Sequence, residues 1–559
     1  MRFSNINSRL RSPDLVLSAI YLISVWVLCL GFLERSQLQN SFTILPGDRY
    51  DAVISASILE HWYNVLQGKA VWSEVKYYFP YSRTIVQTDA YFLIGLAYAP
   101  FRVFGLDPFI SQEFAGLVIK SIGFFGAFFL TRKSFGFSFW FAVLAATLFT
   151  MSNGMTSHSS RLQLSTVALA PFVGFLLWNS LSAFWREDSR GFLTWGIATA
   201  VAFGAWCLTC FYMAWFFAFY NLLLFGVLLA LMRKEMRAEF FEKAKKQHFN
   251  LYVVIAFGIM FLLPFAWAFL PKSLEVGVRT YEMVFSNTVV PEAILQVGKS
   301  NLLYGALYNN ILTKMSPTYA PNGEYYNVGF APALFFIFVG GFFIALKNRF
   351  QHVQSLFVFA FALTTMISIF LLIKLYGFSA WFIVYSIMPG AKALNAISTF
   401  LIFLALPLIV VSVYYLQCKK LPSYLLWFVV AILIVGEINT PELNLVRDSE
   451  NQRIALPELP PDECKAFYVS GWNNQEEISG FANWINAYYA HNVTAMMIAQ
   501  KINIPTVNGI ASFNQPDWNF GFPNNFDYED RVMNYVKKHN ISGLCQLDLN
   551  SKKWAMKLS

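Results

Sequence analysis

Long apolar runs recur along the first four fifths of the chain, and short polar stretches separate them. An apolar run of about 20 residues is the length that an α-helix needs to cross a bilayer. The pattern therefore predicts an α-helical polytopic membrane protein with about eleven transmembrane helices, near residues 14–33, 113–130, 137–151, 163–184, 192–208, 212–232, 250–270, 328–346, 353–376, 397–417 and 421–437.

Composition agrees with this class of protein. Of 559 residues, 57% are hydrophobic and only 13% are charged, and the mean hydropathy is +0.48. The formal charge of +9 is also found in nucleic-acid-binding proteins, but here Lys and Arg form short clusters between the apolar runs. Such clusters mark cytoplasmic loops of membrane proteins, so we expect no nucleic-acid partner.

The basic clusters also predict the orientation. Five of them fall on one side of the membrane if the predicted helices alternate: Arg132-Lys133, Arg186 with Arg190, residues 233–246, Lys347 with Arg349, and Lys419-Lys420. The N-terminus is then a retained cytoplasmic anchor in a bacterial inner membrane, and the segment after residue 437 is periplasmic. The apolar piece 91–104 has about 14 residues and is short for a core of about 30 Å, so we expect it to be interfacial or re-entrant.

Residues 1–437 are thus predicted to form a transmembrane domain, and residues 438–559 a soluble periplasmic α/β domain. Pro, Asn, Asp and Glu become frequent after residue 437, with strands expected at 466–470 and 543–547 and helices at 483–501 and 529–539. Cys464 and Cys545 are the two cysteines of this exported region, so we predict that they form a disulfide; two unpaired thiols are the alternative.

The first outer loop, residues 34–112, is too long for a simple connector. It contains Asp48 and Asp51, two carboxylates close to the membrane that are costly unless they are paired or used. Residues 51–68 are predicted to form a helix on the membrane surface, with an apolar stripe that also carries Asp51 and His61. A cap role for Asp51 and a packing role for His61 are the alternatives.

Other candidate contacts for a substrate lie in the same loop and in two further outer segments. Arg83 and Asp89 stand among aromatic residues, a mixture that suits a sugar phosphate or an ordinary interfacial belt. His158 and Arg161 lie between two predicted spans, and Lys392 follows Met388-Pro389-Gly390; the second large outer loop is 271–327. Arg161 and Lys392 are candidates for an anion, with snorkelling or interfacial anchoring as the alternative.

The arrangement resembles the GT-C class of membrane glycosyltransferases. Short motifs are more specifically similar to a bacterial branch of polytopic proteins grouped with YfhO-like and O-antigen-modifying transferases: Gly47-Asp48, Leu59-Glu60-His61, Tyr78-Phe79-Pro80, His158 with Arg161-Leu162-Gln163-Leu164, Met388-Pro389-Gly390, and in the tail 495–500 and 505–509. The resemblance covers most of the chain and points to a superfamily more than to a substrate.

The resemblance implies a hexosyl- or pentosyltransferase that moves a sugar from a polyprenyl-phosphate donor to an envelope glycan, such as lipopolysaccharide, or to a lipid acceptor. It implies an inverting reaction with an acid of the first outer loop as general base, here Asp48, with Asp51 as the second choice. Arg83, His158, Arg161 and Lys392 are the candidate phosphate contacts, and Glu60 and His61 are candidates for orienting the acceptor or supporting the loop. No cofactor is required, and the resemblance leaves room for a divalent metal without naming ligands.

Two other classes of protein share many of these features. A transporter or lipid flippase also has many spans and polar cavities, but its polar groups gather near the middle of the membrane and its helices are often interrupted. O-antigen polymerases and ligases have long outer loops as well.

Overall fold

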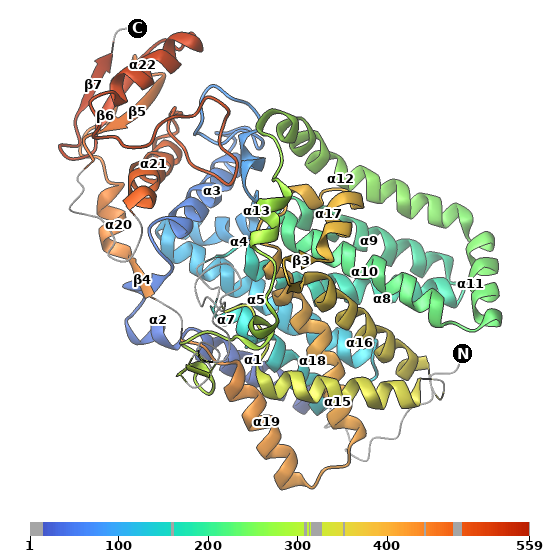
Figure 1. The fold of residues 1–559 in the computed structure, drawn as a ribbon. Coiled ribbons are helices and arrows are strands. Elements are labelled where there is room, and N and C mark those ends of the chain that lie inside the picture. The colour runs from blue at the N-terminus through green and yellow to red at the C-terminus, as the bar shows by residue number, and fades with distance from the viewer. Residues whose placement is uncertain are drawn as a thin grey trace.

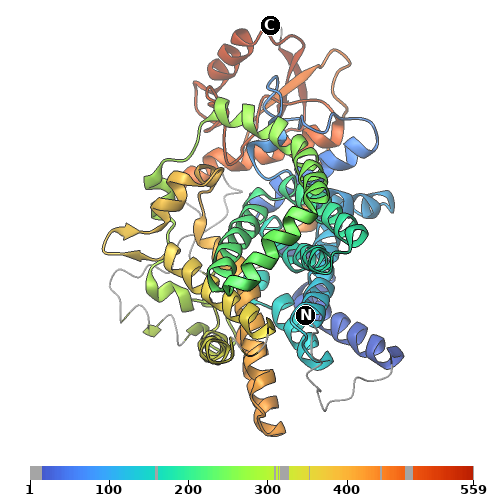
Figure 2. The ribbon, with the colours of Figure 1, turned by 90° about the vertical axis from the view of Figure 1, so that its right-hand side faces the viewer.

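The computed structural model describes residues 15–157, 161–306, 310–311, 314, 327–349, 351, 353–440, 443–472 and 483–557. These residues are mostly helical. Figure 1 shows a bundle of long helices with the C-terminal strands at one end, and Figure 2 shows the same strands from the side.

Eight helical segments in the described part of the chain are long and apolar enough to cross a membrane. They are built from α1 (Leu15–Leu33), α5 (Pro108–Lys133), α6 (Phe139–Thr150) with α7 (Asn153–Ser157), η2 (Leu164–Ala168) with α8 (Leu169–Trp185), α10 (Phe211–Leu231), α12 (His248–Val276), α16 (Val353–Leu372), and η5 (Ile397–Thr399) with α18 (Phe400–Cys418). The predicted helical architecture, with many apolar helices of spanning length, is confirmed.

The other three predicted spans are also helices, but they are not among these eight. They are α9 (Ser189–Cys207), α15 (Pro332–Asn348) and α19 (Ser423–Glu437), with 19, 17 and 15 residues. A count of eleven crossings therefore stays a prediction.

The centre of the bundle is α18, which is buried along its length up to its last turn. It packs against α6, α10, α15 and α16, whereas α1 and α12 lie at the outside with exposed apolar faces. Small residues allow close helix packing: a Cβ at Gly204 of α9 would lie 2.6 Å from the carbonyl oxygen of Phe261 in α12.

The first outer loop folds into α2 (Arg35–Gln39), β1 (Ile44–Pro46), α3 (Asp51–Leu66), η1 (Thr84–Gln87) and α4 (Phe92–Val103). A helix is found at the predicted place, but the prediction that it lies on the membrane surface is wrong. Packed against α4, α5 and α21 (Asn483–Ile502), α3 is buried on almost all sides. The helix α4 has 12 residues and spans about 18 Å, too short to cross a bilayer.

Shorter elements complete the loops between the long helices. They are α11 (Lys234–Lys246), α13 (Tyr281–Ser286), η3 (Pro291–Leu295), β2 (Lys374–Leu375), β3 (Phe378–Ser379), α17 (Trp381–Ile387) and η4 (Ala391–Ala393).

The C-terminal region contains both strands and helices. Its strands are β4 (Leu443–Val446), β5 (Ala466–Ser470), β6 (Leu544–Asp548) and β7 (Trp554–Lys557), and its helices are α20 (Arg447–Arg453), α21 and α22 (Tyr528–Lys538). In the sheet, β5 pairs parallel with β6, and β6 pairs antiparallel with β7, so the order is β5-β6-β7. A disulfide joins Cys464 to Cys545, with the two Cα atoms 5.7 Å apart.

The first outer loop and the C-terminal region are interlocked. The strand β1 pairs antiparallel with β4, and α21 lies beside α3 (Figure 1). One hydrophobic core runs from the membrane helices through α3 into α21 and β5, while a second core between β5, β6 and α22 also takes in Phe79 and Tyr81 of the first loop. The C-terminal region is therefore part of the same packed body as the first loop.

Candidate functional site

Asp48 stands at the turn that begins α3. Its Oδ1 accepts the backbone N–H groups of Tyr50 at 2.8 Å and of Asp51 at 2.9 Å. Asp48 therefore caps the start of the helix, whereas the sequence suggests a cap role for Asp51. Both of these bonds are made by Oδ1.

Arg161 pairs with the second carboxylate. Its Nε lies 3.5 Å from Oδ2 of Asp51, and the two side chains are 35% and 44% exposed. An ion pair that is this accessible to solvent contributes little to stability. Its effect is local, because it places a positive charge next to both acids.

The pKa of Asp48 is raised to about 6. Burial is the main cause, and the negative charge of Asp51 adds to it. The two backbone N–H groups and Arg161 act in the opposite direction. A carboxylate with this pKa binds and releases a proton close to neutral pH.

Tyr489 brings α21 of the C-terminal region to the two acids. Its ring packs edge-on against Tyr50 with the centroids 5.7 Å apart. Burial and the charges of Asp51 and Asp48 raise the pKa of Tyr489, while Arg161 and Arg279 lower it. The phenol group therefore stays protonated beside these four charged groups.

Two hydrogen bonds, one from Arg49 and one from Asn64, fix α21 in this position. Nη2 of Arg49 donates to Oγ1 of Thr494 at 3.2 Å, and the Arg49 guanidinium lies over the ring of Trp472 at 4.7 Å. Further along the helices, Nδ2 of Asn64 donates to the carbonyl oxygen of Gln500 at 2.8 Å. Both donors belong to the first loop, so the acids and Tyr489 are held by one interface.

Asp89, like Asp51, lies close enough to Tyr91 to act on its pKa. Its Oδ1 accepts the N–H of Phe211, the first residue of α10, at 2.9 Å, and burial raises the pKa of Asp89 to about 6. The charges of both Asp89 and Asp51 help to raise the pKa of Tyr91, whose hydroxyl donates to Oε1 of Gln163 at 2.7 Å. Asp89 is thus a second acid with a raised pKa near the same site.

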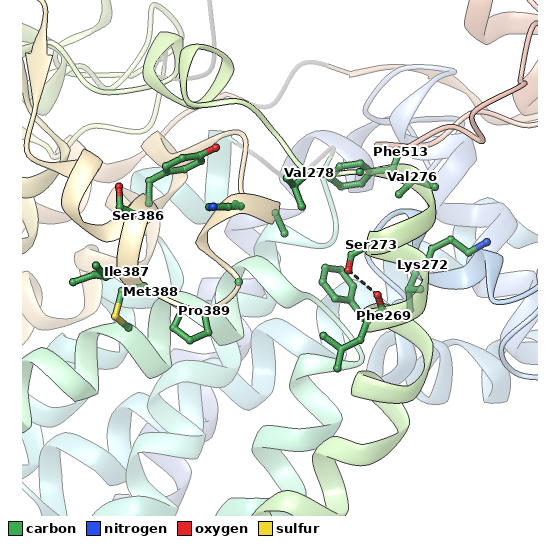
Figure 3. A pocket seen from close by; sticks show the side chains of 17 residues that line it. Phe269, Lys272, Ser273, Val276, Val278, Ser386, Ile387, Met388, Pro389 and Phe513 are labelled. Atoms are coloured by element: carbon green, nitrogen blue, oxygen red, sulfur yellow. Dashed lines mark hydrogen bonds between the residues drawn. The ribbon is translucent and has the colours of Figure 1, made fainter.

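A cavity of about 380 Å³ opens between the C-terminal end of α12 and the segment that joins α17 to η4. Figure 3 shows its two walls, with Phe269, Ser273 and Val276 on one side and the residues from Ser386 to Pro389 on the other. Lys392 also lines the cavity, whereas Lys272 points away from it and pairs with Glu275 at 2.8 Å. Exposed apolar residues form the rim: Leu270, Val278 and Ile387.

Arg279 connects the cavity with the acids. Its backbone N–H donates to the carbonyl oxygen of Lys392 at 3.0 Å, and its guanidinium lies over the ring of Phe513, a lining residue, at 4.3 Å. The same residue acts on the pKa of Tyr489. The sequence did not single out Arg279 or Tyr489, because neither stands in a distinctive local pattern.

Two sequence candidates turn out to be structural residues. Glu60 is buried and binds Arg102 through both oxygens, at 2.8 and 2.9 Å, and also accepts the hydroxyl of Tyr98 at 2.6 Å. His61 is fully buried with Nε2 3.1 Å from the carbonyl oxygen of Trp72, and burial lowers its pKa to about 4. Neither has a surface left for a substrate, so of the two expected roles they support the loop and do not orient an acceptor.

The remaining candidates lie elsewhere or outside the described residues. Arg83 stacks on the ring of Trp267 in α12 with its Cζ 4.5 Å from the ring centroid. His158 lies outside the described residues. Within the described part of the chain, no group of three or more His, Cys, Asp or Glu side chains is placed to hold a metal ion.

No protein-family model and no curated protein sequence matches this chain. Among solved structures, it is similar to the oligosaccharyltransferase of Archaeoglobus fulgidus in its apo form, at 12% identity over 93% of this chain and 69% of that chain, with a TM-score of 0.47. The complex of the A. fulgidus enzyme AglB with an inhibitory peptide and a dolichol-phosphate gives 11% identity, 97% and 75% coverage and a TM-score of 0.48. The complex with Zn and sulfate gives 14% identity over 94% of this chain and 67% of that chain, with a TM-score of 0.49. At TM-scores below 0.5 these similarities assign neither a fold nor a function to this chain.

Proposed function

We propose that this protein is an inverting membrane glycosyltransferase of the GT-C type, which moves a sugar from a polyprenyl-phosphate donor to an envelope glycan or lipid acceptor on the periplasmic face. One observation carries the proposal: Asp48, a carboxylate with a pKa of about 6, is linked through Tyr489 and Arg279 to a cavity that combines exposed apolar residues with Lys392. A general base and a site for a lipid phosphate are the two things that such a transfer needs.

Asp48 acts as the general base. It takes the proton of the acceptor hydroxyl while that oxygen forms a bond to the anomeric carbon of the sugar. A positioned base of this kind accelerates a reaction by about 10²–10⁴-fold, and works best when its pKa is near the operating pH. Asp51 is the second choice, because Arg161 already engages it.

The donor occupies the cavity. The bond between the anomeric carbon and the phosphate oxygen breaks, and its electrons remain on the polyprenyl phosphate. Lys392, which lines the cavity, stabilises the charge on that phosphate, and the exposed apolar rim suits the first units of a polyprenyl chain. Arg161 serves the acceptor side, next to the acids.

The proposed orientation follows from the position of the site. The helix α3 and the C-terminal strands lie toward one end of α12, and α11 with its basic residues lies at the other (Figure 1). If basic loops face the cytoplasm, the site is periplasmic in a bacterial inner membrane.

The test is transfer by the purified protein in lipid. Labelled polyprenyl-phosphate sugars and a panel of acceptors are supplied to the wild type and to Asp48→Asn, Asp51→Asn and Asp462→Asn, the last an exposed control carboxylate. We expect Asp48→Asn to lose about 10²-fold or more of the rate, and Asp462→Asn to keep it. No transfer with any donor, or full activity in both of the first two variants, would reject the catalytic proposal.

The same preparation separates the alternatives. A lipid flippase would move labelled donor across the bilayer of a proteoliposome without transfer, and independently of Asp48. An O-antigen polymerase or ligase would transfer a preassembled glycan from a lipid diphosphate and leave a polyprenyl-phosphate monosaccharide unused.

A further inference from the structure

The helix α11 lies directly between two of the apolar helices. Only Met232 and Arg233 separate it from α10, and only Gln247 separates it from α12. Figure 1 shows α11 across the ends of these helices, far from the C-terminal strands. With such short links to two helices that are fit to span the membrane, α11 has to lie at the bilayer surface.

One face of α11 packs on the protein. Phe240 and Ala244 contact the small core of Ala183, Phe184 and Phe192, and the side chain of Gln247, just after α11, donates to the carbonyl oxygen of Phe184 at 2.8 Å. This face fixes the rotation of the helix.

A second face holds the acids and neutralises them. Glu235, Glu239 and Glu242 follow one another at helical spacing. Lys243 lies 2.8 Å from Glu187 and 3.8 Å from Glu239, and Lys246 lies 3.4 Å from Glu242. Glu239 and Glu242 are therefore each paired with a lysine of α11.

A third face has only basic and aromatic side chains. At about 3.6 residues per turn, Lys234, Arg237, Phe241 and Lys245 share this face, and His248 continues it into α12. All five are exposed, and Phe241 keeps 58% of its surface. Within the described residues, no carboxylate lies within ion-pair distance of Lys234, Arg237 or Lys245.

We propose that this third face binds the headgroups of anionic phospholipids, with Phe241 inserted at the boundary of the acyl chains. Helices with one aromatic anchor among basic residues bind membrane surfaces in this way. The neighbouring start of α12 exposes Phe249 and Tyr252, aromatic residues of the kind that lie at the membrane–water interface, as proposed for Phe241. Charge complementarity selects an anionic over a zwitterionic lipid, since each Lys or Arg at an anionic surface contributes to binding.

The test compares lipid binding by the full-length protein in detergent, measured by native mass spectrometry with phosphatidylglycerol or phosphatidylcholine of the same acyl chains. The variant K234Q/R237Q/K245Q removes the charges of the third face and keeps good helix formers. The matched control K69Q/K465Q/K537Q removes the same net charge from exposed lysines outside α11.

We expect the α11 variant to bind phosphatidylglycerol about fivefold more weakly for each charge removed, and phosphatidylcholine unchanged. Phe241→Ala should weaken the binding of both lipids. Phosphatidylglycerol binding that equals the wild type in the α11 variant would overturn the proposal and leave the face to a protein partner. An equal loss in the control variant would also overturn it, because bulk charge would then explain the binding.

Discussion

Nε of Arg161 lies 3.5 Å from Oδ2 of Asp51, so the two carboxylates at the start of α3 differ in their surroundings. Asp51 has a cation beside it, whereas Oδ1 of Asp48 accepts two backbone N–H groups and its pKa is raised to about 6. This difference gives the site a pH dependence that identifies the base.

We predict that kcat/KM for transfer falls below about pH 6 with unit slope. A general base has to be deprotonated, and Asp48 carries its proton below its pKa of about 6. The same shift affects stability in the opposite sense: a folded pKa above that of the unfolded chain means that this group favours folding most at low pH and progressively less as the pH rises to about 6. Initial rates between pH 4.5 and 8 at subsaturating donor measure the activity limb; a flat profile would remove Asp48 from this role.

Arg161→Gln should move that acid limb to a higher pH. The guanidinium lowers the pKa of Asp48, so its removal raises that pKa, while Asp51 continues to raise it. Arg186→Gln, which removes an exposed arginine at the far end of α8, is the matched control and should leave the limb in place.

Tyr489→Phe should reduce kcat/KM by about three- to tenfold, the effect of losing one hydrogen bond, without a change in thermal stability. The ring still packs against Tyr50 in the variant, and only the hydroxyl near Asp48 and Asp51 is lost. Tyr488→Phe, one residue earlier on α21, is the control, because Tyr488 packs against Trp518 and Phe522. Equal activities of Tyr489→Phe and wild type would show that the C-terminal region only supports the first loop.

The sequence predicts those parts of the fold that depend on local pattern. Apolar runs locate α8 and α10 because the bilayer sets their length, and β5 lies at its predicted residues. The surroundings of α3 were not predictable in this way, since α21 covers it from more than 400 residues away in the chain. For the same reason the sequence does not predict the ion pair of Glu60 with Arg102 or the position of Tyr489 beside the acids.

A second long-range pair gives a prediction about stability. Nζ of Lys120 in α5 lies 2.7 Å from Oε1 of Glu34, and both side chains are buried. Lys120→Met leaves the Glu34 carboxylate without this partner, so we expect the free energy of unfolding to fall by about 3–5 kcal/mol. The double variant E34Q/K120M should recover part of the loss, and Lys133→Met, at the exposed end of α5, should change little. Unfolding of the detergent-purified protein followed by circular dichroism checks all three.

The disulfide gives the last prediction. Under denaturing, non-reducing conditions we expect four reactive thiols among the six cysteines, and all six after reduction, because Cys464 and Cys545 are joined. The bond closes a loop over a separation of 81 residues, so its removal in C464S/C545S should lower the free energy of unfolding by about 4 kcal/mol. C207S/C210S, which changes two free and buried cysteines in the membrane bundle, is the control for the thiol count and should show two reactive thiols before reduction. Six reactive thiols in the unreduced wild type would show that the two cysteines stay apart in the protein as isolated.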